Sequence, residues 1–371
     1  MNSKKEIWIN GKFLSLPVTG VQRFSWGICQ ALYEKGFQLN ILMNKDLQHQ
    51  PDFGKLIRVG KHSGIFWEQV ELPRFLKNHG NPMLFNPGNV APVIYTNNFV
   101  VVHDAATLEP HSEWFSTGFR MWYQWLIPQL AKRAKIATVS RFSAERLAHF
   151  LNLDIDQIPV LYNGIYFHKV DDSNKTENNA LPEKPYILAV GSHNPRKGID
   201  LLINAFLSVP QLHKNYDLLI IGSHSRHFKD FELKDHPSIL WKQNVSDTAL
   251  IHYYKNTDLV VVPSRYEGFG IPVLEALHFN KPVLCNAIPV FKELFGSSVD
   301  YTDFEQTSIS AQKLIEKLGN NPKQIKNNKL KKPLQGNLSA FQLNKCSFKS
   351  SASTIESYIQ KEYIREETCN E

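Results

Sequence analysis

Residues 258–276 read Asp258-Leu-Val-Val-Val-Pro-Ser-Arg-Tyr-Glu-Gly-Phe-Gly-Ile-Pro-Val-Leu-Glu-Ala276. A short, continuous apolar run such as the one that opens this stretch is typical of a strand buried on both faces. The glycines after it favour a tight turn, and Pro272 suits the first turn of a helix, where no N–H donor is needed. The stretch therefore predicts one strand–turn–helix unit of a parallel sheet.

The same alternation of apolar strands and amphipathic helices repeats along the rest of the chain. Strands are expected at residues 99–104, 135–140, 186–191, 216–222 and 258–264. Helices long enough to cross over a sheet are expected at residues 19–35, 143–151, 199–207 and 272–279. Repeated βαβ units predict an α/β protein with doubly wound, Rossmann-like domains.

The length and composition predict two domains. The chain has 371 residues, of which 42% are hydrophobic, too many for one ordinary core. Residues 169–185 contain almost nothing that a core could bury, so we expect a hinge there, between an N-terminal domain (1–168) and a C-terminal domain (186–340). Apolar spacing over residues 346–363 predicts that the segment 341–371 contains a closing helix packed on one domain, followed by a tail.

The formal net charge of +7 suits nucleic acid, an anionic membrane surface or an anionic small molecule, and charge alone does not choose among them. Residues 320–336 form a lysine-rich stretch. It is either a solvated loop, the reading we favour, or a basic patch for phospholipid or nucleic acid. No stacking motif or zinc-finger pattern accompanies the basic residues, so nucleic-acid binding is not expected. The lysines are Lys323, Lys326, Lys329, Lys331 and Lys332.

The four cysteines, Cys29, Cys285, Cys346 and Cys369, are far apart and show no CxxC spacing, so we expect reduced or buried thiols. The start of the chain has no basic segment followed by a long apolar core, and no apolar run approaches the roughly 18 residues that span a bilayer. These features predict a cytoplasmic protein without a signal peptide or membrane span.

The turn after residue 264 carries the sharpest chemical pattern. Gly268 and Gly270 allow close backbone approach to a ligand, and the free amides of the following helix suit a diphosphate. The turn brings Glu267 and Glu275 towards one ligand, where carboxylates accept hydrogen bonds from sugar hydroxyls. The alternative is a purely structural turn with two ordinary acidic residues.

The E-x7-E pair around Gly-Phe-Gly-Ile-Pro resembles the signature of retaining glycosyltransferases of family 4. These enzymes have the GT-B fold, in which two Rossmann-like domains face each other across a cleft. Motifs at family-like positions lie in both halves of the chain: Thr-Gly-Val-Gln-Arg (19–23), Val-His-Asp (102–104), Val-Ser-Arg-Phe-Ser (139–143), Asn-Gly-Ile (163–165) and Val-Gly-Ser-His-Asn-Pro-Arg-Lys-Gly (190–198). The details are similar to a branch with many bacterial mannosyl- and rhamnosyltransferases of surface polysaccharide synthesis.

The resemblance implies roles for individual residues. Glu267 would contact the donor hexose and His103 the transferred sugar. Lys197 follows a strand and a short loop, where its ammonium can meet a diphosphate. These three are the expected catalytic residues. A solvated lysine and a buried core histidine are the alternatives for Lys197 and His103. The expected donor-binding residues are Gly20, Arg23, Ser192, Arg196, Gly222, Asn244, Val245, Gly268, Phe269, Gly270, Ile271 and Glu275, the last of these at the ribose.

One position departs from the family pattern. Many members have an arginine immediately after the strand that ends at Gly191, whereas this chain has Ser192. Arg196 is the candidate to supply the missing charge. The Asp154-Ile-Asp156 pair resembles a metal-binding pattern of glycosyltransferases with a different fold, but it lies in an expected surface loop, so no metal is expected.

The sequence and the resemblance together predict a retaining glycosyltransferase that needs neither metal nor cofactor. The expected donor is a nucleotide diphosphate sugar, with GDP-mannose favoured. The acceptor would be a glycan or lipid-linked oligosaccharide of surface polysaccharide or lipopolysaccharide synthesis, and peripheral contact with the inner face of an anionic membrane is expected. The alternatives are a nucleotide-sugar epimerase of the same fold and a non-catalytic nucleotide-sugar-binding protein.

Overall fold

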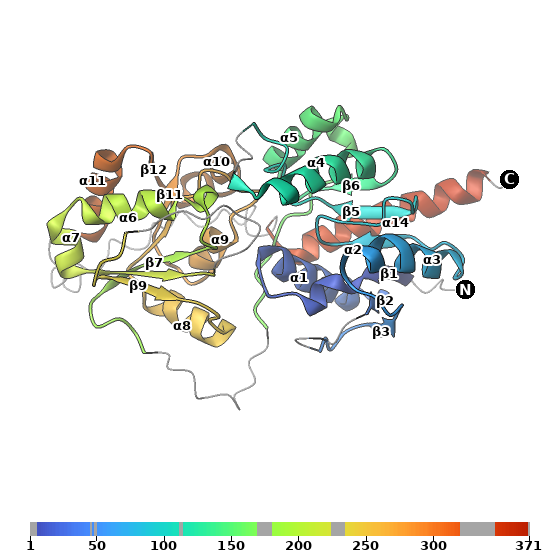
Figure 1. Cartoon of the computed structure of the whole chain (residues 1–371), viewed down its shortest axis with the longest axis horizontal. Coiled ribbons are helices and arrows are strands. Elements are labelled where there is room, and N and C mark those ends of the chain that lie inside the picture. The colour runs from blue at the N-terminus through green and yellow to red at the C-terminus, as the bar shows by residue number, and fades with distance from the viewer. Residues whose placement is uncertain are drawn as a thin grey trace. The chain divides into compact units, whose positions relative to one another are not determined.

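The structure is a computed structural model that describes residues 6–44, 47, 50–110, 114–168, 180–223, 234–319 and 346–369, with side chains as far as residue 360. The chain forms two compact units, each with its own parallel sheet (Figure 1). The first unit comprises Met1–Leu108, Met121–Tyr166 and Leu343–Glu371, and the second comprises Glu109–Arg120 and Phe167–Gln342.

The first unit is built on a six-stranded sheet in the order β3-β2-β1-β4-β5-β6, in which every neighbouring pair is parallel. The strands run outwards from β1 to β3 on one side and from β4 to β6 on the other. The carboxyl ends of β1 and β4 therefore mark a switch point, where open parallel sheets bind their ligands. The strands are β1 (Glu6–Asn10), β2 (Gln38–Met43), β3 (Lys55–Arg58), β4 (Leu84–Asn86), β5 (Asn98–Val101) and β6 (Lys135–Ala137).

Helices connect these strands. The crossover helix α1 begins after Thr19, whose backbone N–H donates to Gln22 Oε1 (3.2 Å), and it buries Phe24, Ile28 and Leu32 at a spacing of four residues. The helical elements are η1 (Gly11–Ser15), α1 (Gly20–Glu34), α2 (Gly64–Phe66), the π-helical turn η2 (Trp67–Glu71), α3 (Leu72–Lys77), α4 (Thr117–Ala131), α5 (Arg141–Leu151) and η4 (Ile155–Gln157).

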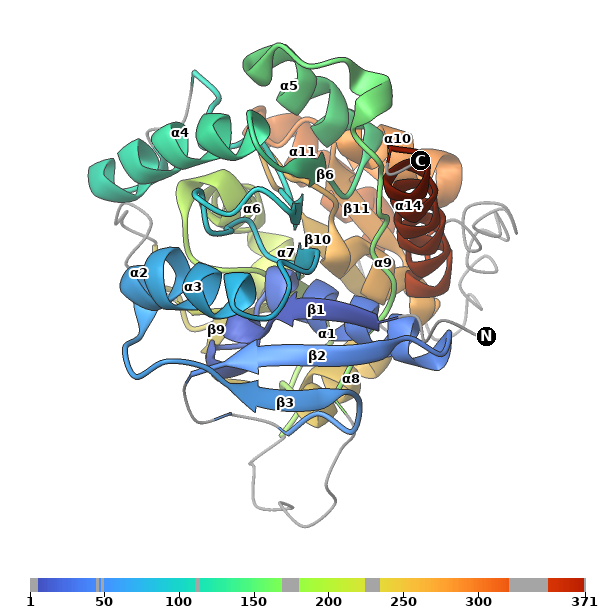
Figure 2. The same cartoon turned by 90° about the vertical axis from the view of Figure 1, so that its right-hand side faces the viewer.

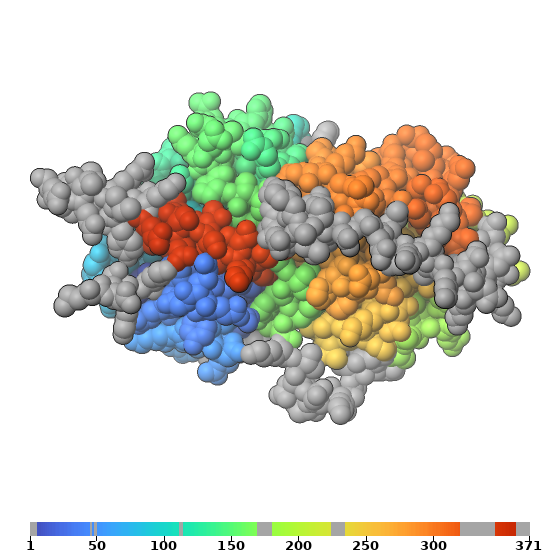
Figure 3. Space-filling view, turned by 180° about the vertical axis from the view of Figure 1, so that it is seen from behind, coloured from blue at the N-terminus to red at the C-terminus, as the bar shows by residue number. Residues whose placement is uncertain are grey.

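The helix α14 (Phe348–Cys369) packs on the first unit. Its first residue, Phe348, packs its ring against two glycines that have no side chain. A Cβ added at Gly27 would lie 2.1 Å from this ring, and one added at Gly164 would lie 2.7 Å from it. Further along, Tyr358 stacks on Phe99 of β5, with ring centroids 4.8 Å apart. Figure 3 shows α14, in red, at the surface of the first unit beside the blue N-terminal part of the chain.

The second unit repeats the plan with a sheet in the order β12-β11-β10-β7-β8-β9, again parallel throughout. Its strands are β7 (Tyr186–Val190), β8 (Asp217–Ile221), β9 (Ile239–Lys242), β10 (Leu259–Val262), β11 (Val283–Asn286) and β12 (Asp300–Thr302). Its helical elements are η5 (Pro195–Lys197), α6 (Ile199–Leu207), α7 (Pro210–Asn215), α8 (Asp247–Asn256), α9 (Ile271–His278), α10 (Pro289–Phe295), η6 (Gly296–Ser298) and α11 (Thr307–Leu318). The switch point lies at the carboxyl ends of β7 and β10.

The α/β architecture predicted from the sequence is confirmed, and the expected strands and helices appear within a few residues of their predicted ends. One segment lies in a different unit from the one to which the expected domain boundaries assign it. Residues 109–120 belong to the second unit rather than the first. In the second unit, the centroid of the Trp114 ring lies 6.3 Å from that of the Tyr266 ring. Residues 169–179 of the expected hinge and the lysine-rich stretch 320–336 lie outside the described residues.

Two further sequence expectations concern thiols and membrane spans. Cys29, Cys285 and Cys346 are buried, as expected. The side chain of Cys369 lies outside the described part. Across the part of the chain that the structure describes, none of the helices combines the length and the apolar character needed to cross a bilayer.

Candidate active site

The glycine turn after β10 takes the form that the sequence predicts. Gly270 caps α9 with φ +105°, a left-handed conformation that favours glycine, and a Cβ there would lie 2.5 Å from the Phe291 ring. Phe269 is buried, with its ring 6.3 Å from that of Phe295. The Phe269 side chain of the turn therefore faces the core.

Glu267 lies just before this turn and is the centre of a buried polar cluster. Its Oε1 accepts hydrogen bonds from Lys197 Nζ (2.6 Å) and from Ser264 Oγ (2.8 Å). Its Oε2 lies 3.8 Å from Nη1 of Arg196. Two of the expected catalytic residues are thus in direct contact, and Arg196 lies beside them.

The environment of this carboxyl determines its charge. Burial alone would raise the pKa of Glu267, but the charges of Lys197 and Arg196 and the hydrogen bonds from Lys197 and Ser264 outweigh burial and lower the pKa below its ordinary value. Glu267 is therefore a carboxylate at neutral pH. It accepts hydrogen bonds and holds the Lys197 ammonium in place.

Glu275 lies inside α9 and is also buried, but its described partner is different. Its Oε2 accepts a hydrogen bond from the Tyr254 hydroxyl of α8 (2.8 Å). The Tyr254 ring in turn stacks on Phe279, with centroids 5.6 Å apart. A buried carboxylate with a fixed orientation suits the recognition of ligand hydroxyls.

The loop that carries Lys197 is clamped to the loop that carries Glu267. Arg265 forms a bidentate ion pair with Asp200 (3.0 and 2.9 Å) and also donates to the Pro195 carbonyl (2.6 Å). Gly198 has φ +64°, and a Cβ there would lie 2.2 Å from the Pro263 carbonyl oxygen. These contacts fix η5 against the end of β10 and so explain why Lys197 reaches Glu267.

Four of the expected donor-binding residues lie elsewhere at this edge of the second unit. Ser192 Oγ accepts a hydrogen bond from Asn194 Nδ2 (2.8 Å). Gly222 follows β8 directly and packs its backbone against Gly191, the residue that follows β7, since a Cβ at Gly222 would lie 1.9 Å from the Gly191 carbonyl oxygen. Asn244 and Val245 form the turn between β9 and α8, and Asn244 has φ +52°. Gly222 thus has a packing role that the sequence did not predict.

In the first unit, His103 follows β5 and is buried. Its Nε2 donates to the Pro87 carbonyl (2.8 Å), and its ring meets Phe24 edge-on, 4.8 Å between centroids. Burial lowers the pKa of His103 and outweighs the opposing effects of the Pro87 carbonyl and Asp104. The imidazole is therefore neutral at pH 7.

Gly20 and Arg23 lie at the start of α1 in the same unit. Gly20 is exposed and forms the first residue of the helix. Arg23 lies about one turn further on, and its Nη1 donates to the Tyr166 carbonyl (2.9 Å). The structure thus places the guanidinium at the end of the segment 163–166 in the first unit.

The structure also shows a buried polar network that the sequence did not predict. Asn10 Nδ2 donates to Glu68 Oε1 and to Asn86 Oδ1, both at 3.1 Å, and Lys12 Nζ donates to Glu68 Oε2 (2.9 Å). These side chains lie at the carboxyl ends of β1 and β4, which is the switch point of the first sheet.

Metal ligands do not gather in the described part of the chain: it contains no group of three or more His, Cys, Asp or Glu side chains placed to hold an ion. In the Asp154-Ile-Asp156 stretch, Asp154 accepts a hydrogen bond from the Asp156 backbone N–H (3.1 Å) and so caps η4. That aspartate has a local structural role.

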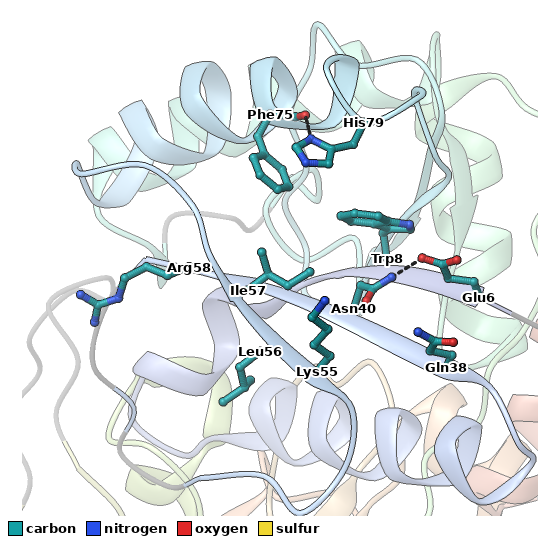
Figure 4. Close-up of a pocket in the computed structure, with 10 residues that line it drawn as sticks. All are labelled: Glu6, Trp8, Gln38, Asn40, Lys55, Leu56, Ile57, Arg58, Phe75 and His79. Atoms are coloured by element: carbon teal, nitrogen blue, oxygen red, sulfur yellow. Dashed lines mark hydrogen bonds between the residues drawn. The ribbon is translucent and has the colours of Figure 1, made fainter.

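A groove of about 560 Å³ lies in the first unit along the whole of β3 (Figure 4). On β1 and β2 its lining residues come from the first three residues of each strand, away from their carboxyl ends. The aromatic rings of Trp8, Phe75 and His79 gather on one side of it, and Asn40 donates to Glu6 beside Trp8. Ligands of open parallel sheets bind at the carboxyl ends of the strands. We therefore do not assign the reaction to this groove.

Comparison with known proteins identifies the family. The family model described as "Glycosyl transferases group 1" matches residues 170–333. The chain is 30% identical over 256 residues to the O-antigen chain mannosyltransferase RfbU of Salmonella typhimurium, a match that covers 66% of this chain and 68% of RfbU. This chain is a group 1 glycosyl transferase. It is also 32% identical over 143 residues to the serotype-specific mannosyltransferase WbdA of Escherichia coli, covering 37% of this chain and 18% of WbdA.

Solved structures support the GT-B fold of this group 1 glycosyl transferase. Sucrose-phosphate synthase from Thermosynechococcus elongatus superposes with a TM-score of 0.67 at 15% identity, covering 97% of this chain and 99% of the other. WaaG, a glycosyltransferase involved in lipopolysaccharide biosynthesis, gives 0.62 at 17% identity, covering 94% and 95%. At these identities the likeness concerns the fold alone.

Proposed function

We propose that this group 1 glycosyl transferase moves a mannosyl residue from GDP-mannose, with retention of configuration, onto a glycan or lipid-linked oligosaccharide of surface polysaccharide or lipopolysaccharide synthesis. The buried cluster of Glu267, Lys197 and Arg196 beside the amino end of α9 is the observation that carries this proposal. The choice of mannose is supported by the printed functions of RfbU and WbdA.

The proposed donor site uses both charge and backbone. Lys197, Arg196 and the amides of residues 268–271 supply positive potential for a diphosphate, and Glu267 accepts hydrogen bonds from the sugar. Glu275 and Tyr254 form a fixed pair that suits the ribose hydroxyls. With this much positive charge from the chain itself, we propose that transfer needs neither metal nor cofactor.

The proposed reaction is a front-face displacement. The bond between the anomeric carbon and the diphosphate oxygen breaks, and the diphosphate keeps the electron pair. The acceptor hydroxyl oxygen bonds to the anomeric carbon on the same face and passes its proton to a diphosphate oxygen. Lys197 and Arg196 stabilise the growing negative charge on the leaving group.

We assign the acceptor to the first unit, where the neutral His103 and the start of α1 lie beyond the carboxyl ends of the strands. Gly20 and Arg23 are proposed contacts of the donor from that unit. If the acceptor is lipid-linked, the enzyme works at the cytoplasmic face of a membrane. We propose peripheral attachment there, and no nucleic-acid partner.

A donor panel tests the proposal. Purified enzyme is incubated with GDP-mannose and with UDP-, dTDP- and ADP-sugars, and both released nucleotide and converted sugar are measured. Selective slow hydrolysis of GDP-mannose is expected, because water replaces the acceptor. Release of the nucleotide from another donor would correct the substrate. Conversion of the free donor to an epimer, or binding with neither hydrolysis nor transfer across an acceptor panel, would replace transfer with the corresponding alternative function.

A further inference from the structure

The groove of Figure 4 follows a part of the first sheet that is unusually polar. Strands of a parallel sheet are ordinarily buried on both faces and apolar, and alternate residues of a strand share a face. On the face beside the groove, four such positions carry polar side chains: Glu6 of β1, Gln38 and Asn40 of β2, and Lys55 of β3. The strand register agrees, since Glu6 pairs with Gln38 and Asn40 pairs with Lys55. A face of this composition suits contact with polar groups rather than with a covering helix.

Helix α3 covers only the other half of this face. Further along β2, Leu42 is buried in a core cluster with Leu72 and Leu76 of α3. Trp8 and Phe75 are partly buried at the margin of that cluster. Figure 2 shows β1, β2 and β3 side by side, with α3 towards the arrowhead ends of the strands. The apolar packing therefore ends at the Trp8 and Phe75 rings, and the groove begins there.

Three aromatic rings form one wall of the groove. The rings of Phe75 and His79 are stacked, with centroids 4.0 Å apart, and the Trp8 ring lies 6.2 and 5.9 Å from them. His79 Nδ1 donates to the Phe75 carbonyl (2.8 Å), which fixes the imidazole and leaves Nε2 as its second hydrogen-bonding atom. The wall is thus formed before a ligand arrives, so little side-chain entropy is lost on binding.

The polar side chains of the groove offer both donors and acceptors. Asn40 lines the groove although it is only 4% exposed, and its Nδ2 donates to Glu6. Among the described residues this is the one hydrogen bond of the Asn40 side chain, so Oδ1 can accept from a ligand. Gln38 and Lys55 are exposed, and within the described part of the chain their side chains have no hydrogen-bond partner. An amide both donates and accepts, and an ammonium donates.

This combination favours a sugar over other ligands. A pyranose ring has an apolar face of C–H groups, which suits an aromatic wall, and hydroxyls at its rim, which both donate and accept. The volume of about 560 Å³ falls within the usual range of small-ligand sites, about 300–1,000 Å³. Glu6 opposes the charges of Lys55 and Arg58, which does not suit a polyanion, and the polar sheet face does not suit an acyl chain.

We infer that this groove binds one sugar of a glycan chain, with the Trp8 ring against the face of the sugar. Gln38, Asn40 and Lys55 bind its hydroxyls. The groove lies away from the carboxyl ends of β1 and β2, so the sugar held there is not the one that receives the transferred residue. A chain held at both places presents its reacting end at a higher effective concentration. That this chain is the glycan acceptor rests on the proposed function.

Affinity electrophoresis tests the groove without any reaction. The full chain is run in native gels with and without a dissolved neutral α-mannan, and in further gels with dextran or galactan. The α-mannan should slow the chain. Trp8→Ala should weaken this binding by about tenfold or more, because the sugar loses the ring on which it packs. Gln38→Ala/Lys55→Ala alters exposed side chains only, so the fold is kept, and the loss of their hydrogen bonds should also weaken binding about tenfold.

The matched control is Trp125 on α4, which is 50% exposed and lies outside the groove. Trp125→Ala should be slowed like the unaltered protein. Donor hydrolysis and transfer to a monosaccharide acceptor should be the same in all these variants. For a long-chain acceptor, the groove variants should raise KM by about tenfold and leave kcat unchanged, because only such a chain can use both places.

The inference is overturned if none of the three polysaccharides slows the chain, or if the groove variants are slowed as much as the unaltered protein. It is also overturned if sedimentation shows that Gln38→Ala/Lys55→Ala abolishes a dimer or a peptide complex instead of glycan binding. Slowing by dextran or galactan in place of α-mannan would support the groove as a glycan site and correct the sugar. A donor panel that finds another reaction would overturn the proposed function and leave the gel result standing. Normal GDP-mannose hydrolysis without any slowing would remove the groove alone.

Discussion

At the residue scale, the ion pair between Lys197 and Glu267 is the feature on which the proposed chemistry depends. Both side chains are largely buried, and the carboxylate is charged because its cationic neighbours lower its pKa despite burial. The pair therefore keeps an ammonium in a fixed position before any ligand arrives. Such preorganised charge is the largest single contribution in many enzyme sites.

Replacing Lys197 with Ala should lower the turnover number by about 100-fold or more, because the proposed site for the leaving diphosphate loses one of its cations. Folding should be affected much less, since Ser264 and Arg196 remain beside Glu267. The measurements are steady-state transfer and urea unfolding. Lys214→Ala, on the exposed side of α7, is the matched control and should leave both unchanged. Normal turnover in the Lys197 variant would remove this residue from the mechanism.

The buried neutral His103 predicts a specific pH dependence of stability. Its pKa is lowered in the folded state, so the unfolded chain binds more protons below the ordinary histidine pKa of about 6.5. The free energy of unfolding should therefore fall as pH drops below that value, with a slope from this residue of at most about 1.4 kcal/mol per pH unit. In His103→Gln this part of the slope should disappear. Equal slopes in the two proteins, measured by urea unfolding across that range, would contradict the neutral, buried state.

The sequence predicts those site residues that lie in local motifs, and it does not predict those that depend on contacts between distant segments. Lys197 and Glu267 are 70 positions apart, yet each lies in a local motif that can be recognised by itself. The ion pair between Arg265 and Asp200 lies in no such motif. The two residues are far apart in the sequence, so their contact can be recognised only in the folded chain. The same holds for the network around Glu68, whose partner Asn10 is 58 positions away.

At the scale of single elements, the turn before α9 depends on one glycine. Gly270→Ala would place a methyl group 2.5 Å from Phe291 in a backbone with φ +105°, so both strain and crowding oppose it. We expect a loss of about 1–3 kcal/mol in the free energy of unfolding. Gly118→Ala, in the first turn of α4, is the control, because nothing lies within 4 Å of its added Cβ. Equal stability of the two variants would show that the turn tolerates a side chain.

Most elements were predictable because their apolar patterns are local. The buried runs of β7, β8 and β10 carry strand signals by themselves, and α6 appears at the residues expected for it. The exposed aromatic side of α4 carried no comparable signal, since apolar residues on both sides of a helix read as a core element. Only the burial of Leu126 and Leu130 separates its inner side from its outer side.

At the scale of the whole molecule, α14 completes the core of the first unit. Its Phe348 ring lies against Gly27 and Gly164, and it meets Phe24 with centroids 5.9 Å apart. Phe348→Ala should therefore lower the free energy of unfolding of the first unit by about 3–5 kcal/mol, the usual range when a buried phenylalanine is truncated. Differential scanning calorimetry checks this. Tyr33→Ala, exposed on α1, is the control, and a transition unchanged by Phe348→Ala would show that α14 adds little to the core.

The sequence predicted a closing helix but not its destination. An amphipathic pattern states that one side will be buried, and it does not state against which surface. The surface on which α14 packs is determined by two small residues, Gly27 and Gly164, which lie far from α14 in the chain and leave room for the Phe348 ring. Complementarity of this kind is a property of the assembled fold.

The return of α14 to the first unit also sets an order for synthesis on the ribosome. The second unit takes its segments from residues 109–120 and 167–342, so all of them have been translated before the last part of the chain. The first unit, although it begins the chain, waits for Phe348 to emerge from the exit tunnel before its core can close over Gly27. The half of the protein that is made first is therefore the half that is finished last, and nascent chains that stall before α14 present an incomplete first unit to chaperones and proteases.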